Sequence, residues 1–320
     1  MKPRLISASL LALLLAACTN DNDPMTPADG EVAAQIVAEI NHVATRASGT
    51  QWAANDRIGI STVSVTKTSY TNVPYTWNGT EFEDNGTIIY FQDTKPVTFN
   101  AYYPYAEKGG TVEAVTNANA QKDENQKNID FLFAKGAKAD KKNSVVYFTD
   151  KRKDNGEDNS FHHCMSMIAI EFSEGDDIAF SDKKLQSYTL KGLVLEGTFN
   201  TETGEAKTTD GKQAADLKTE YTDEVTVNSG VFTAAPVIVF PQTPQWAWEG
   251  ASVEGKIGLE VMVEDETYHA TLTIPGGITA LEAGCRYTFP VTVKKTGLSV
   301  GTAEITDWEP VTGSGTEATM

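Results

Sequence analysis

The sequence predicts an all-β protein. Short runs rich in Thr, Val, Ile, Tyr and Phe recur along its 320 residues, and Gly, Asn and Asp separate them. This is the pattern of many strands joined by turns. Two pairs, Asn78-Gly79 and Asn85-Gly86, favour tight hairpins because both residue types tolerate positive φ. Long apolar periodicity of the helical kind is nearly absent.

Individual strands can be placed by their side-chain pattern. Alternation of apolar and polar residues, typical of strands with one solvated face, occurs in residues 97–103, 257–263 and 268–274. Residues 164–172 are apolar on both faces, so we expect a buried central strand there. Pro290 interrupts the run 287–293, and because proline has no N–H, that strand is expected at a sheet edge.

Residues 32–44 allow two interpretations. The segment is rich in Ala, which favours a helix. Its even-numbered residues from Val32 to Ile40 are apolar and alternate with Gln35 and Glu39, which favours a strand. The residues alone leave both open. Further along, polar stretches at 116–128 and 151–160 interrupt the first half of the chain.

The N-terminus has the layout of an export signal. Lys2 and Arg4 precede an apolar run, 5–15, that is too short to span a bilayer. The run ends in Leu-Ala-Ala-Cys, which resembles the lipobox of bacterial lipoproteins, and Cys18 is therefore the predicted lipidation site. Residues 19–30 are polar, acidic and interrupted by proline, so a solvated tether is expected after the lipid.

Composition and charge exclude some functions. Cleavage before Cys18 would leave 320 − 17 = 303 residues, enough for two domains of ordinary size. The formal charge is −18, and the chain has no basic cluster, so it would repel nucleic acid and anionic lipid. Cys164 and Cys285 would remain after lipidation, either as a disulfide of an exported protein or as separate buried thiols.

Catalytic chemistry is not predicted. The chain has four His and no nucleophile elbow, zinc-protease helix motif or phosphate-binding loop. His162, His163 and Cys164 are neighbours, but adjacent strand residues point to opposite faces, so we expect one buried and one exposed His and no metal. No cofactor is predicted either. Trp246 and Trp248 would share a face of an extended segment, and they are the candidate contacts for a glycan or host ligand.

Ordered sequence blocks identify a family resemblance. Residues 52–60 read Trp-Ala-Ala-Asn-Asp-Arg-Ile-Gly-Ile, similar to the Trp-x-x-x-Asp-x-Ile-Gly signature of the fimbrillin family, the type V pilins. Later blocks follow in the family's order. They are the Phe-x-Ala-Tyr-Tyr-Pro-Tyr run in 97–105, the Phe-x-His block 161–170, the Pro-Gln segment 237–242, and the closing Tyr-x-x-x-Val and Ile-x-x-Trp strands between 284 and 308.

This resemblance implies two transthyretin-like β-sandwich domains in tandem. The expected organisation is a signal peptide at 1–17, a tether with a removable N-terminal strand at 18–46, and domains at 47–180 and 181–320. Arg46 and Ala47 match the family's cleavage site for an Arg-specific protease, and residues 298–308 belong to the candidate donor region. Under the resemblance, residues 32–44 form the removable strand.

The function implied is structural and not enzymatic. We expect a stalk, tip or anchor subunit of a surface fimbria that acts in cell adhesion. Its partners would be other fimbrial subunits, joined by β-strand addition after proteolysis, and its location the outer membrane and cell surface through the lipid on Cys18. The alternative is a surface lipoprotein that does not polymerise and binds a glycan or host protein through Trp246 and Trp248.

Overall fold

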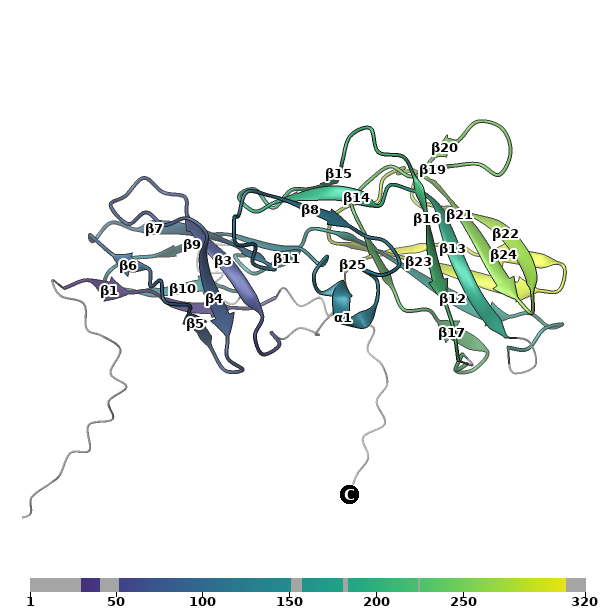
Figure 1. Cartoon of the computed structure of the whole chain (residues 1–320), viewed down its shortest axis with the longest axis horizontal. Coiled ribbons are helices and arrows are strands. Elements are labelled where there is room, and N and C mark those ends of the chain that lie inside the picture. The colour runs from purple at the N-terminus through teal and green to yellow at the C-terminus, as the bar shows by residue number, and fades with distance from the viewer. Residues whose placement is uncertain (1–29, 41–51, 151–156, 181–183, 224, 309–320) are drawn as a thin grey trace, which may run out of the picture.

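The computed structural model describes residues 30–40, 52–150, 157–180, 184–223 and 225–308. Within these ranges the chain is built almost entirely of strands, so the all-β prediction is confirmed, and the single helix there is α1 (Asp123–Gln126). None of the described helical residues forms a segment long and apolar enough to cross a membrane. Figure 1 shows an elongated molecule with N-terminal strands at one end and C-terminal strands at the other.

The N-terminal end is organised around one eight-stranded sheet. Its order is β10 (Val145–Phe148), β2 (Gln35–Ala38), β5 (Phe82–Asp84), β4 (Val73–Trp77), β3 (Arg57–Thr62), β7 (Val97–Tyr103), β9 (Leu132–Ala139) and β11 (His162–His163). A separate pair joins β1 (Val32–Ala33) to β6 (Tyr90–Phe91). The core beneath these strands is aromatic and aliphatic, and it includes Trp52, Phe99 and Phe148.

The C-terminal end is a sandwich of two sheets. The first holds β17 (Val231–Thr233), β12 (Ser166–Glu174), β23 (Cys285–Lys294) and β24 (Gly297–Val300), with β18 (Val237–Val239) also on β12 and β25 (Glu304–Asp307) also on β23. The second holds β16 (Ala215–Glu220), β13 (Leu185–Leu193), β21 (Lys256–Val263) and β22 (Glu266–Thr273). Apolar residues from both sheets, such as Ile170 and Leu259, form one core between them.

A third cluster of buried residues joins the two ends. A small sheet pairs β8 (Thr111–Val115), β14 (Glu196–Asn200) and β15 (Ala206–Thr208), so that β8 and β14, which lie far apart in sequence, hydrogen-bond to each other. Phe131 from the N-terminal end stacks on Phe199 with ring centroids 4.5 Å apart. The last pair, β19 (Gln245–Trp246) and β20 (Val253–Glu254), forms a separate hairpin.

Two of the predicted strands are present. Residues 32–38 form strands β1 and β2, which resolves the ambiguity in favour of β-structure. β12 is a central strand with β23 on one side and β17 and β18 on the other, and its residues 166–170 are buried, as expected for a run that is apolar on both faces.

The edge position predicted from Pro290 is wrong. β23 is a central strand, since β12 lies on one side and β24 and β25 lie on the other. Pro290 is tolerated because its carbonyl accepts a bond from Gly301 N, 2.9 Å away, in the gap between β24 and β25. The backbone N of a strand residue faces the same side as its C=O, so the missing N–H falls at an interruption of the ladder.

Candidate functional site

The N-terminal strand β2 is an internal strand of the eight-stranded sheet, between β10 and β5. It pairs in parallel with β10, where Val145 to Phe148 lie opposite Gln35 to Ala38, while its pairing with β5 consists of Ile36 opposite Phe82. The inward side chains of this segment are aliphatic and buried: Ala34, Ile36, Ala38 and Ile40. The chain before residue 40 therefore completes a sheet whose other strands all come from later in the sequence.

Trp52 ties this strand to the core. It is 8% exposed, and its Nε1 donates a 2.9 Å bond to the Ala38 carbonyl of β2. The indole ring packs edge-on against Phe82, Tyr103 and Phe161 with centroids 5.1–5.6 Å apart. Such edge-to-face pairs are favourable beyond their buried area. Trp52 thus links β2 to the aromatic core of the N-terminal end.

Three further main-chain hydrogen bonds hold the β2 segment in the sheet. Gln35 N donates to Ser144 O at 3.0 Å, Glu39 N donates to Phe148 O at 2.9 Å, and Phe161 N donates to Glu39 O at 3.0 Å.

Beside Trp52, burial raises the pKa of Tyr103, and the nearby Asp56 carboxylate, which accepts a bond from the Tyr103 hydroxyl, acts in the same direction. Tyr103 therefore stays a neutral donor.

The candidate donor region is folded onto its own chain in this state. β24 and β25 both pair with β23, and Trp308 is 1% exposed. The Trp308 ring stacks on His163 with centroids 4.3 Å apart. Any donation of residues 298–308 to another molecule would have to break these contacts. Cys18, Arg46 and Ala47, the predicted lipidation and cleavage residues, lie outside the described residues.

The two candidate ligand-binding tryptophans differ in their surroundings. Trp246 and Trp248 are in contact, with ring centroids 5.5 Å apart. A methyl group on Gly258 would overlap the Trp246 indole, so Trp246 packs directly against the backbone of β21. Trp248 is 37% exposed, donates its Nε1 to Ala270 O and lies against His269. Trp248 is therefore the more exposed of the two and the better candidate for contact with a ligand.

The histidine pair has the predicted arrangement. The His162 side chain is 47% exposed and that of His163 is 3% exposed. His163 Nδ1 lies 2.7 Å from Asp130 Oδ1, a buried interaction between β11 and the segment just before β9. Among the described residues no group of three or more His, Cys, Asp or Glu could hold a metal ion. Cys164 and Cys285 are free, and burial raises the pKa of the Cys164 thiol to about 12.

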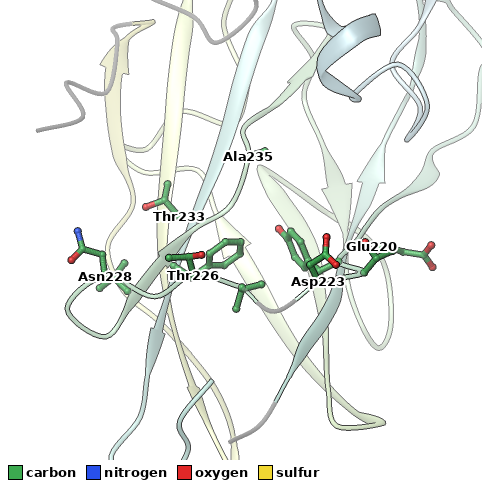
Figure 2. Close-up of a pocket in the computed structure, with 11 residues that line it drawn as sticks. Glu220, Asp223, Thr226, Asn228, Thr233 and Ala235 are labelled. Carbon is green, nitrogen blue, oxygen red and sulfur yellow. The ribbon is translucent and has the colours of Figure 1, made fainter. Parts of the chain in front are cut away.

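A cavity of about 530 Å³ opens at the C-terminal end, between the end of β16 and strand β17. Figure 2 shows Glu220 and Asp223 on one side of it and Asn228 and Thr233 on the other. The Tyr221 and Phe232 rings contact each other edge-on within its wall. Burial raises the pKa of Tyr221, so its hydroxyl stays neutral beside the carboxyl groups of Glu220 and Asp223.

Comparison with known proteins assigns the family. Residues 45–308 match the model of the fimbrillin-like family. The chain belongs to the fimbrillin-like family. It is 27% identical to a candidate fimbrium subunit, Fim1C, of Bacteroides uniformis over 98% of this chain and 97% of that protein. A solved candidate cell adhesion protein of Bacteroides ovatus has a TM-score of 0.65 and 27% identity, covering 88% of this chain and 99% of that one.

A second solved structure, a candidate cell adhesion protein of Bacteroides uniformis, shares the fold of this fimbrillin-like chain. Its TM-score is 0.62 at 23% identity, with 88% of this chain and 100% of that chain covered. The family resemblance read from the sequence blocks is thus confirmed. The blocks did not reveal β10, the parallel partner of β2, although the Val-Val-Tyr-Phe composition of residues 145–148 is typical of a buried strand.

Proposed function

We propose that this fimbrillin-like chain is a structural or accessory subunit of a surface fimbria, assembled by strand exchange and acting in adhesion. One observation carries the proposal. β2 fills an internal position of the eight-stranded sheet and contributes only the aliphatic side chains of Ile36 and Ala38 to the core. A strand of this kind can be replaced by another extended segment that has the same alternation.

The connection of β2 to the rest of the chain supports exchange. Arg46 and Ala47 lie in sequence between β2 and Trp52. Cleavage there would leave β1 and β2 held only by hydrogen bonds and side-chain packing. Their departure would expose the main-chain edges of β5 and β10 together with the rings of Trp52, Phe82 and Phe161. A donor segment from a second copy would then fill the groove.

Export as a lipoprotein fits this scheme. The lipid on Cys18 would bring the precursor to the outer membrane and the cell surface, and the cut after Arg46 would release the mature subunit from it. A subunit that keeps the Arg46–Ala47 bond would remain at the membrane as an anchor. The same protein is therefore a fibre subunit or the base of the fibre, according to whether that bond is cut.

The domain division belongs to the proposal as well. We expect two transthyretin-like sandwiches, with a boundary earlier than residue 180. β12 precedes that residue, yet it hydrogen-bonds to β17, β18 and β23 of the C-terminal end. A boundary near residue 165, between β11 and β12, keeps the core of each end within one domain, while the third cluster packs across the boundary.

An Arg-specific protease tests the function. The purified full-length chain should yield a stable fragment that begins at Ala47, and this fragment should form polymers visible by electron microscopy. Arg46→Lys keeps the charge but removes the cleavage site, so it should prevent both. Arg57→Lys is the matched control, because Arg57 is exposed on β3 and its replacement should change neither. A fragment beginning at Ala47 that stays monomeric would refute assembly by exchange.

A further inference from the structure

Three glutamine side chains lie along the outer edge of β18. On its inner side β18 pairs with β12. On its outer side Ile238 N donates to Gln121 Oε1, and Gln121 Nε2 donates to Ile238 O, both at 2.8 Å. These two bonds are the pair that a residue of a neighbouring antiparallel strand would make. The side-chain amide of Gln121 therefore occupies the place of a strand.

The neighbouring outward groups are bonded in the same way. Gln126 Nε2 donates to Pro236 O at 2.9 Å, and Gln242 Nε2 donates to Phe240 O at 3.1 Å. Residues 236, 238 and 240 are two apart, so their main-chain groups face the same side of the strand. Pro236 has no N–H to offer there. Each of these three outward carbonyls thus already has a glutamine donor.

Glutamine suits this role because its amide carries a donor and an acceptor, as a peptide group does. The amides are held in position before any partner arrives. Gln121 Nε2 also donates to Thr116 O at 3.0 Å, and Gln126, which is 6% exposed, lies 3.4 Å from Gln121 Oε1. Gln242 exchanges two further bonds with the main chain of Val194.

We propose that Gln121, Gln126 and Gln242 form a cap that blocks the addition of another strand at the β18 edge by occupying its outward main-chain groups. Gln121 is the main determinant, because it bonds both the N–H and the C=O of Ile238. The excluded partner is an extended segment of a second copy of this chain. An unprotected edge is a template for such pairing. The inference rests on the proposed function in one respect: a subunit that assembles by strand exchange must confine exchange to one groove. Beyond β18 the same sheet edge continues as β17, which borders the cavity of Figure 2.

Gln121→Met in the uncleaved full-length chain tests the cap, since it keeps the length of the side chain and removes both bonding groups. Amide hydrogen exchange at Ile238 should accelerate about tenfold in dilute solution, as expected when one hydrogen bond of ordinary strength is lost. At high concentration the variant should self-associate in light scattering, and Ile238 should become protected again. Gln213→Met, at an exposed glutamine, is the matched control and should stay monomeric.

The result that would overturn the cap is a folded Gln121→Met chain that exchanges faster at Ile238 but stays monomeric at every concentration. The glutamines would then only hold the 116–128 segment in place. If Gln121→Met does not fold, Gln121→Asn decides the question, because it keeps a polar amide that is one methylene too short to reach Ile238. Its self-association supports the cap, and a monomer refutes it. No protease is used, so failure of the chain to polymerise after cleavage would be a separate result.

Discussion

Trp52→Phe should weaken the hold on the N-terminal strand. The replacement keeps an aromatic ring but removes the donor that bonds Ala38 O at 2.9 Å within the core. Loss of that bond costs about 1 kcal/mol. The space left by the second indole ring, which now packs among Phe82, Tyr103 and Phe161, adds about 1–2 kcal/mol. The free energy of unfolding should therefore fall by about 2–3 kcal/mol.

Urea unfolding followed by far-UV circular dichroism measures this change, and the melting temperature should fall by roughly 3–5 °C for a chain of this size. Trp248→Phe is the matched control. Trp248 also donates its Nε1 to a main-chain carbonyl at 2.9 Å but is 37% exposed, so its replacement should cost less than about 1 kcal/mol. In the chain cut after Arg46, Trp52→Phe should speed release of the N-terminal strand by at least about tenfold. Equal losses for the two variants would refute the role of Trp52.

Three further changes have defined outcomes. Gly258→Ala should displace the Trp246 indole, lower the free energy of unfolding by about 1–3 kcal/mol and shift the tryptophan fluorescence; an unchanged spectrum would contradict the packing role. His163→Leu removes a buried partner of Asp130 and should cost about 3 kcal/mol in urea unfolding. Burial raises the pKa of Tyr188 to about 12, so between about pH 10 and 12 the unfolded chain releases a proton that the folded chain keeps. The free energy of unfolding should then fall by about 1.4 kcal/mol per pH unit from this group, and Tyr188→Phe should make the measured fall shallower.

Local pattern was sufficient for much of the fold. Apolar and polar alternation marked the strands that have one solvated face, and the doubly apolar run at 164–172 correctly indicated a central strand. The opposite faces of adjacent strand residues gave the correct burial of His162 and His163. The segment 32–44 was different. Its composition satisfied two periods at once, and the strands at Val32–Ala33 and Gln35–Ala38 depend on partners, β6, β5 and β10, that only the folded sheet provides.

Long-range pairing could not be predicted from pattern. β2 and β10 are separated by more than 100 residues, and nothing in either segment specifies a parallel partner at that distance. Trp246 and Trp248 show the same limit for the candidate site. Their spacing places them together, but only the glycine backbone beneath Trp246 distinguishes a packing residue from one with an exposed face.

Pro290 and Gln121 show why the position of a strand in a sheet depends on the direction of its main-chain groups. Pro290 lies in a central strand without loss, because its missing N–H faces an interruption of the ladder. Ile238 lies in a strand at the end of a ladder, yet its outward N–H and C=O are both bonded to the amide of Gln121. From residue type alone, β23 would be expected at a sheet edge because of its proline, and β18 would be expected to pair freely with another strand. If the chain exchanges strands as we propose, the positions open to a new strand are set by which outward main-chain groups lack a bond. The outward groups of β18 are bonded by glutamines, whereas those of β5 and β10 are bonded by β2, the strand that we propose is removed.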